Sequence, residues 1–194
     1  HIAEIPQKFQ KNRIQMIRFS GFHRRDTVAY RTGMKQLLIP LALLAFATPV
    51  AAKDSLGVFG QWGAFRDAEV PRCYAIAEAE DSRNRRDFEP YASVGTWPER
   101  RVRGQVHFRL SRELSDSPRL RLAIGSQRFD LTGGGNEGWA VDGSDDAAIV
   151  AAMRSGNRMS ISATDNRGNR FTDRYSLEGA ATALDAASVG CASR

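Results

Sequence analysis

Residues 104–110, Gly-Gln-Val-His-Phe-Arg-Leu, and residues 120–131, Leu-Arg-Leu-Ala-Ile-Gly-Ser-Gln-Arg-Phe-Asp-Leu, decide the fold class. In both stretches apolar and polar side chains alternate, which is the pattern of strands that bury one face. Gly125 and Ser126 divide the second stretch, and a two-residue loop that begins with Gly suits a type II′ hairpin. The two halves of that stretch are therefore predicted to be neighbouring antiparallel strands.

Further strands are expected where apolar residues recur at strand spacing, at residues 58–65, 72–77, 91–97, 158–163 and 171–177. The last two are joined by the turn-rich residues 165–169, as in another hairpin. Residues 78–90 are predicted to be a solvated loop because charged side chains fill them, and residues 133–136 are predicted to be a glycine turn.

Helix signals are fewer than strand signals. One helix is expected after Ser144 as its N-cap, with an apolar stripe of Ile149, Ala152 and Met153 and an end at Arg154 and Gly156. An Ala-rich helix is expected over residues 179–187, stopping near Gly190. The expected fold class is α+β and predominantly antiparallel β, a sandwich or a curved sheet, with two short helices.

The first 52 residues differ in composition from the rest of the chain. They hold eight of the 28 Lys and Arg residues and two of the 22 Asp and Glu residues, so residues 53–194 contain twenty of each sign. Residues 34–52 have the layout of a secretory signal peptide: a short positive start, an apolar centre and small residues that allow cleavage after Ala52. Residues 1–33 show no strand or helix period, and we interpret them as an over-extended reading frame before Met34.

This interpretation predicts an exported protein. The alternative is a membrane anchor, but Pro40 and Pro49 break the apolar run, which is shorter than the roughly 18–20 residues that span a bilayer. We expect a single β-rich domain over residues 53–194, in the periplasm, secreted or at the cell surface, without a stable membrane span after signal cleavage. Because the positive excess lies in residues 1–52, no nucleic-acid partner is expected.

Residues that could carry catalysis are scarce beyond residue 52. His107 is the one histidine there, so a site with several histidine ligands is excluded, and we expect no metal and no cofactor. His107 falls on the polar side of its strand, where a largely solvated spectator is favoured over a general base. No nucleophile-elbow motif is present, and the acidic residues at 142–146 lack calcium-loop spacing, so no catalytic residue is assigned.

Arginine is the notable residue type, because every cation after Lys53 is an arginine. If the strands at 104–110 and 120–131 are adjacent, one outward face carries Gln105, His107 and a candidate anion-binding set, Arg109, Arg119, Arg121 and Arg128. Guanidinium groups suit phosphate and carboxylate, so envelope lipids, glycans or an acidic protein are candidate partners. The alternative is an ordinary solvated face in which acidic residues such as Asp130 are interleaved.

Cys73 and Cys191 are the two cysteines of the chain. In an oxidising compartment they have one possible intramolecular pairing, and we expect a structural disulfide between them. An intermolecular bridge and two free thiols are the alternatives. Their separation excludes a C-x-x-C redox motif.

Several short segments resemble the invasion-associated locus B family. They are residues 61–65 (QWGAF), 72–76 (RCYAI), 146–156 (DAAIVAAMRSG), 176–184 (SLEGAATAL) and the terminal Gly190-Cys191. The resemblance spans the chain from about Trp62 to Cys191. It implies an exported protein of the periplasm or outer surface, associated by name with entry into host cells. No catalytic residues are established for the family.

The function expected from the sequence is therefore that of an exported, non-catalytic binding protein of the bacterial envelope, in the periplasm or at the cell surface, whose partner is an envelope or host-surface component. Two alternatives remain at this point. One is a small periplasmic hydrolase that uses two carboxylates, which would be indicated by two converging Asp or Glu side chains with a perturbed pKa. The other is an inhibitor of an envelope enzyme, which would be indicated by a rigid loop that inserts into a partner.

Overall fold

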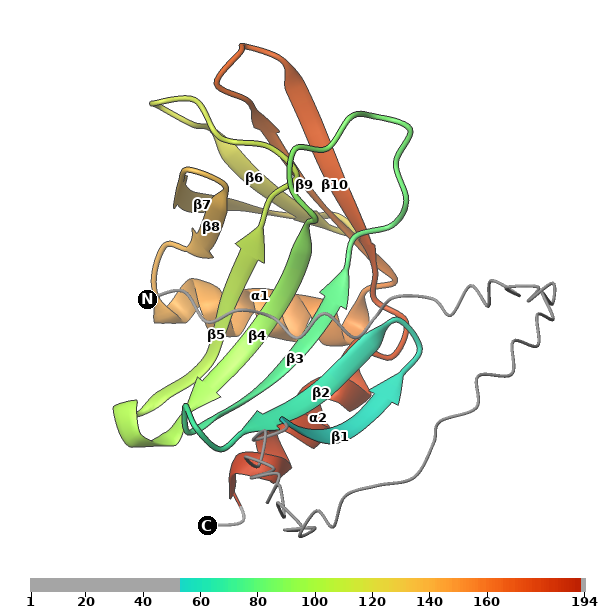
Figure 1. Ribbon diagram of the computed structural model, residues 1–194, viewed down its shortest axis with the longest axis vertical. Helices are drawn as coiled ribbons and strands as arrows, with labels where there is room; N and C mark the ends of the chain where they lie inside the picture. The colour runs from blue at the N-terminus through green and yellow to red at the C-terminus, as the bar shows by residue number, and fades with distance from the viewer. Residues whose placement is uncertain (1–52, 193–194) are drawn as a thin grey trace, which may run out of the picture. The chain divides into compact units, whose positions relative to one another are not determined.

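A computed structural model of the protein describes residues 53–192 (Figure 1). The expected signal peptide and residues 1–33 lie outside the described residues. The strands are β1 (Asp54–Phe59), β2 (Trp62–Asp67), β3 (Arg72–Glu78), β4 (Tyr91–Trp97), β5 (Val102–Arg109), β6 (Leu120–Ile124), β7 (Gln127–Gly134), β8 (Glu137–Ala140), β9 (Arg158–Thr164) and β10 (Arg170–Ser176). The helices are α1 (Gly143–Ser155), α2 (Ala180–Ala192) and a short 3-10 turn, η1 (Pro98–Arg100).

The ten strands form one antiparallel sheet in the order β1-β2-β3-β4-β5-β8-β7-β6-β9-β10. The expected fold class, predominantly antiparallel β with two helices, is confirmed. Figure 1 shows β9 and β10 crossing the direction of β4 and β5, as the accumulated twist of a large sheet requires. The hairpin expected at Gly125 is present, with Ile124 opposite Gln127 in β6 and β7.

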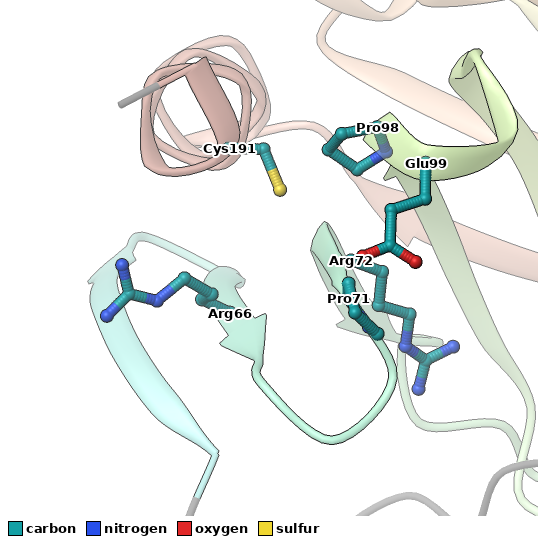
Figure 2. A pocket seen from close by; sticks show the side chains of 6 residues that line it. All are labelled: Arg66, Pro71, Arg72, Pro98, Glu99 and Cys191. Carbon is teal, nitrogen blue, oxygen red and sulfur yellow. The ribbon is translucent and has the colours of Figure 1, made fainter. Parts of the chain in front are cut away.

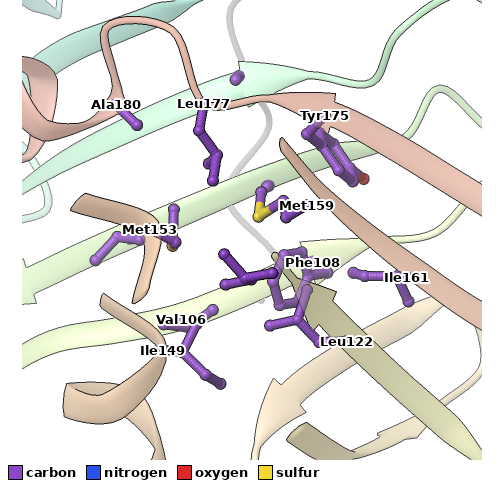
Figure 3. Packing of buried hydrophobic residues seen from close by; sticks show 14 of the residues in the cluster. Val106, Phe108, Leu122, Ile149, Met153, Met159, Ile161, Tyr175, Leu177 and Ala180 are labelled. Carbon is purple, nitrogen blue, oxygen red and sulfur yellow. The ribbon is translucent and has the colours of Figure 1, made fainter. Parts of the chain in front are cut away.

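Both helices pack against the same face of the sheet, which we call the inner face. Helix α2 contacts β1, β2 and β3, and helix α1 contacts β5 (Figure 1). Phe108 of β5, Leu122 of β6 and Ile161 of β9 are fully buried on this face and meet Ile149 and Met153 of α1 in the core (Figure 3). The alternation read from the sequence therefore puts the apolar side of each strand in the core.

Residues 58–65 are two strands instead of the one expected. The aromatic spacing of Phe59, Trp62 and Phe65 hides a turn at Gly60, which has a positive φ of 56°. This turn contacts the end of β10: the Gln61 N–H donates to the Glu178 carbonyl at 3.1 Å, and the Trp62 indole N–H donates to the Ser176 carbonyl at 2.9 Å. These two hydrogen bonds therefore connect the β1–β2 hairpin to the end of β10 and to the segment between β10 and α2.

Helix α1 is capped by Asp142 and not by Ser144. The Asp142 carboxylate accepts hydrogen bonds from the N–H groups of Ser144 (2.8 Å) and Asp145 (3.0 Å), because the helix begins two residues earlier than expected. The expected apolar stripe of α1 is buried and the helix ends before Gly156, as predicted.

Helix α2 runs past Gly190, where the sequence predicted its end. A Cβ at Gly190 would lie 2.5 Å from a methyl group of Leu56, so glycine lets the helix lie close to β1. The additional residues at the end of α2 place Cys191 next to Cys73 of β3.

Strand β8 was not expected from the sequence, and it changes the order of the sheet. It pairs with β5 on one side, with Phe108 opposite Gly138, and with β7 on the other, with Thr132 opposite Trp139. Strands β5 and β6, expected to be adjacent, are therefore separated by β8 and β7. Strand β8 is only four residues long and contains Gly138, so it carries little alternation.

Candidate functional site

The sulfur atoms of Cys73 and Cys191 are bonded, with Cα atoms 5.7 Å apart. Cys73 is fully buried on the inner face of β3, and Cys191 lies in the last turn of α2. The bridge ties the third strand to the last helix and contains no group that could act on a substrate. Its place in the fold is structural.

A hollow of about 320 Å³ lies beside this bridge (Figure 2). Arg66 and Arg72 line it with Glu99 and Cys191. Both cations already have partners, because Arg66 donates to Asp54 at 2.6 Å and the guanidinium of Arg72 is 3.7 Å from Asp67. The hollow therefore has little unneutralised charge to offer a ligand.

The candidate anion-binding arginines fall into two places. Arg109 is on β5, where its guanidinium stacks 5.7 Å from the Phe88 ring centroid and lies opposite Glu137 of β8. Arg128 lies on β7, which β8 separates from β5, and Arg121 lies one strand further, on β6; Arg119 directly precedes β6. Arg121 and Arg128 lie on adjacent strands as expected, but the expectation that the strand of Arg109 adjoins them is wrong, because β5 pairs with β8.

Strands β9 and β10 bring three further arginines to the outer face of the sheet. The cross-strand pairs show this directly: Arg128 lies opposite Ala123, Ala123 opposite Ser160, and Ser160 opposite Arg174. Arg158 and Arg170 follow by alternation along their strands. We call the following set the arginine face: Arg119, Arg121, Arg128, Arg158, Arg170 and Arg174, all exposed.

The arginine face contains a hollow of about 560 Å³ lined by Arg128, Arg158 and Arg174. The small side chains of Ala123 and Ser160 separate Arg128 from Arg174, whose Cα atoms are three strand spacings, or about 14 Å, apart. Among the described residues, no Asp or Glu lines this hollow. The hollow therefore has the small side chains of Ala123 and Ser160 at its base and arginine side chains on both sides.

Most of the positive charge of the arginine face is not neutralised within the described part of the chain. Arg121 pairs with Asp130 at 3.3 Å, and Arg158 is 4.0 Å from Glu80; the other four arginines form no ion pair with residues 53–192. Arg128 donates to the carbonyls of Gly125 (3.0 Å) and Gln127 (2.8 Å), which holds its guanidinium at the rim of the hollow. The face can therefore recognise an anion by forked hydrogen bonds.

His107 is half-buried, not largely solvated as the sequence predicted. Only 22% of its side chain is exposed, because β8 places Glu137 and Trp139 beside it. Its Nε2 contacts the Glu137 carboxylate, its Nδ1 is 3.5 Å from the Ser93 hydroxyl, and the Trp139 ring is 5.4 Å away. The Ser–His–Glu order resembles a hydrolase arrangement, but neither hollow described above includes these residues.

Two carboxylates, the partly buried Asp146 and the buried Asp173, form hydrogen bonds that support the fold. Burial raises the pKa of Asp146, which accepts the Val106 N–H at 2.7 Å where β5 extends past β8. Burial also raises the pKa of Asp173, which accepts the Ser111 N–H at 2.9 Å. Neither hollow is lined by two carboxylates, so no pair of the kind that a carboxylate hydrolase needs is brought together there.

Two searches of the described residues address metal and membrane binding. Residues 53–192 hold no group of three His, Cys, Asp or Glu side chains placed to bind a metal ion. Within the same range, neither helix has the length and apolar character that crossing a bilayer requires.

Comparison with known proteins gives a likeness of fold. The sequence matches no family model and no curated protein. Among solved structures, invasion associated protein B from Bartonella henselae is similar, with a TM-score of 0.51 and 17% sequence identity over 69% of this chain and 95% of that one. At this identity the likeness concerns the fold alone.

Arg158, Arg170 and Arg174 were missed by the sequence interpretation. Arg158 and Arg174 occupy outward positions of expected strands, and Arg170 directly precedes the strand expected at residues 171–177, so the alternation itself contained the signal. The missing information was the order of the strands, because nothing local to residues 158–174 indicates that β9 pairs with β6.

Proposed function

We propose that the protein is an exported, non-catalytic binding protein of the cell envelope that holds an anionic ligand on the arginine face. The observation that carries the proposal is the hollow between Arg128, Arg158 and Arg174, which no described carboxylate lines. Six arginines and one aspartate occupy this side of four strands in a domain with equal numbers of acidic and basic residues. Such a concentration of one sign creates a field that attracts an opposite charge.

The ligand group would carry phosphate, sulfate or carboxylate oxygens. Arginine forks match these groups with paired hydrogen bonds, and Ser155, Asn157 and Ser160 add polar contacts at the same hollow. Because 82% of the Arg158 side chain is exposed, solvent screens its charge, and binding should weaken as salt rises.

Export is supported by three separate features. Residues 34–52 have the signal-peptide layout. The Cys73–Cys191 bridge suits an oxidising compartment. The fold resembles a protein that is associated with invasion by its name. N-terminal sequencing of the protein from cell fractions tests this part, with a start at Lys53 outside the cytoplasm expected and an intact Met34 start in the membrane pellet contradicting it.

The anion-binding part is tested by replacing Arg128, Arg158 and Arg174 together with Ser. We expect binding of the protein to tripolyphosphate, measured by calorimetry at two salt concentrations, to fall by at least about tenfold, because three charged hydrogen-bond donors are lost. The matched control replaces Arg83, Arg100 and Arg154, exposed arginines outside the arginine face, and changes the net charge equally. Equal affinities of the two triple variants would refute the arginine face as the site.

A further inference from the structure

The other half of the outer face, across β2, β3, β4, β5 and β8, is rich in aromatic rings. We call it the aromatic face, and it consists of Phe65, Tyr74, Tyr91, Trp97, His107 and Trp139. Of these, Tyr74 is buried, with the Arg72 guanidinium 4.8 Å from its ring centroid, so the other rings form the exposed part of the face. The cross-strand pairs Phe65 with Tyr74 and His107 with Trp139 place these residues opposite the helix-covered side. Helices α1 and α2 pack on the inner face, so neither helix covers the rings.

Two of the rings lie flat against the sheet because glycines are beneath them. A Cβ at Gly95 would lie 2.5 Å from the Trp97 indole, and a Cβ at Gly63 would lie 2.7 Å from the Phe65 ring. Aromatic side chains that cover strand glycines in this way pack one side of the ring on the backbone. Both side chains are partly exposed, and the Phe65 ring also stacks on Tyr74, with ring centroids 5.6 Å apart.

Polar groups are interspersed with the rings. Glu137 contacts His107, Ser93 lies on the other side of the imidazole, and 36% of Trp139 is exposed beside them. Burial and the nearby Glu137 carboxylate raise the pKa of Tyr91 to about 12, further above neutral pH, where a tyrosine hydroxyl is already a donor. The face combines apolar stacking surfaces with donors and acceptors of hydrogen bonds.

This combination matches the chemistry of a sugar ring. A pyranose has C–H groups on its faces, which stack on aromatic rings, and hydroxyls at its rim, which bond to carboxylates, imidazoles and phenols. A lipid surface would need an apolar patch without the partly buried charges of Glu137 and Arg109, and a phosphate alone would make no stacking contact with the rings. A few polar groups among apolar rings are what a small-molecule site presents.

The aromatic face continues directly into the arginine face. Trp139 of β8 lies opposite Thr132 of β7, and the next outward residue of β7, Asp130, lies opposite Arg121. An extended ligand could therefore contact both. We infer that the ligand is an acidic oligosaccharide, whose sugar rings stack on the aromatic face while its anionic groups bind the arginine face. This inference rests on the proposed function, because it takes the arginine face to be an anion site.

The test compares four probes on the protein produced from the full chain: a heparin hexasaccharide, neutral chitohexaose, tripolyphosphate, and vesicles containing phosphatidylglycerol. We expect Trp139→Ala to weaken hexasaccharide binding by about five- to tenfold, the scale of a lost aromatic contact. Its affinity for tripolyphosphate should stay within twofold. Trp139→Phe should retain most of the hexasaccharide affinity, and Val141→Ala, which removes another exposed apolar side chain, serves as the control.

The outcomes separate the two proposals. The triple variant of Arg128, Arg158 and Arg174 should lose affinity for both the hexasaccharide and tripolyphosphate. If Trp139→Ala binds the hexasaccharide as tightly as the wild type does, the glycan inference is wrong even where the arginine triple variant shows that the anion site is real. Preference for the vesicles over the hexasaccharide would also overturn it. A shift of the tryptophan emission of the wild-type protein with hexasaccharide, absent with tripolyphosphate, gives a readout that does not depend on variant folding.

Discussion

Removing the Cys73–Cys191 bridge should cost the protein a large part of its stability. The two residues are 118 positions apart, so the bridge closes a long loop. In the chain-entropy model a loop of that length contributes about 4.9 kcal/mol at 25 °C. The total stability of a domain is roughly 5–15 kcal/mol, so the loss would leave a marginally stable protein.

The perturbation is the double variant Cys73→Ala and Cys191→Ala, because a single substitution would leave a thiol able to pair between molecules. Ala is preferred to Ser because Cys73 is fully buried and a hydroxyl there would need a partner. Urea unfolding followed by circular dichroism measures the free energy of unfolding, and the reduced wild-type protein should show the same loss. A double variant within about 1 kcal/mol of the oxidised wild type would refute the reasoning, since the entropic term alone predicts several times that.

Three further predictions concern the fold. Gly179→Ala should destabilise by at least about 3 kcal/mol, because its φ is +85° and a Cβ would lie 1.8 Å from the Phe59 carbonyl oxygen. Gly135→Ala, with a φ of +59° but nothing within 4 Å, should lose only about 1 kcal/mol in the same urea titration, and equal losses would refute the close contact. Tyr175→Phe should raise stability by about 1 kcal/mol, because the Tyr175 hydroxyl is buried without a hydrogen-bond partner among the described residues; a drop in melting temperature would contradict this. Asp165 and Asp173 should have opposite effects on the pH dependence of stability. Burial alone would raise the pKa of Asp165, but hydrogen bonds from Asn169, Arg112 and Arg167 together lower it, so its stabilising effect is present above its unfolded pKa of about 3.9 and lost as the pH falls through the folded value. Burial raises the pKa of Asp173, so this carboxyl contributes stability in its protonated form. That contribution is fully present below its unfolded pKa of about 3.9 and is lost as the pH rises through its folded pKa. In unfolding titrations from pH 3 to 7, Asp165→Asn should therefore be less stable than the wild type mainly at the neutral end, and Asp173→Asn should gain relative to the wild type there; parallel curves for both variants would contradict the assignment.

The strands with clear alternation were predictable from the sequence, and their partners were not. Local alternation in residues 120–131 defined both strands and the turn at Gly125, since a hairpin needs no distant information. The pairing of β5 with β8 depends on a four-residue strand with almost no pattern, so the neighbours of His107 could not be predicted. The contact between His107 and Glu137 follows from that pairing alone.

The candidate site was predicted in part for the same reason. Outward positions such as Arg121 and Arg128 follow from alternation, and the structure places them outward. Arg109 was grouped with them through a wrong strand order, and Arg174 was missed because its distance from Arg128 is set by two intervening strands. The length of α2 was underestimated at Gly190 because a glycine that normally ends a helix serves here to fit against Leu56.

The hydrogen bonds at the end of β10 have a consequence for self-association. An open sheet has two edge strands, and an unpaired edge can template the addition of a strand from another molecule. On the edge of β10 that does not pair with β9, the Arg174 carbonyl accepts the Glu80 N–H at 2.7 Å, and the Ser176 carbonyl accepts the Trp62 indole N–H. At the opposite edge, β1 has a bulge between Ser55 and Gly57, and bulges interrupt regular pairing. Both edges of the sheet thus carry a feature that disfavours the addition of a strand from another molecule.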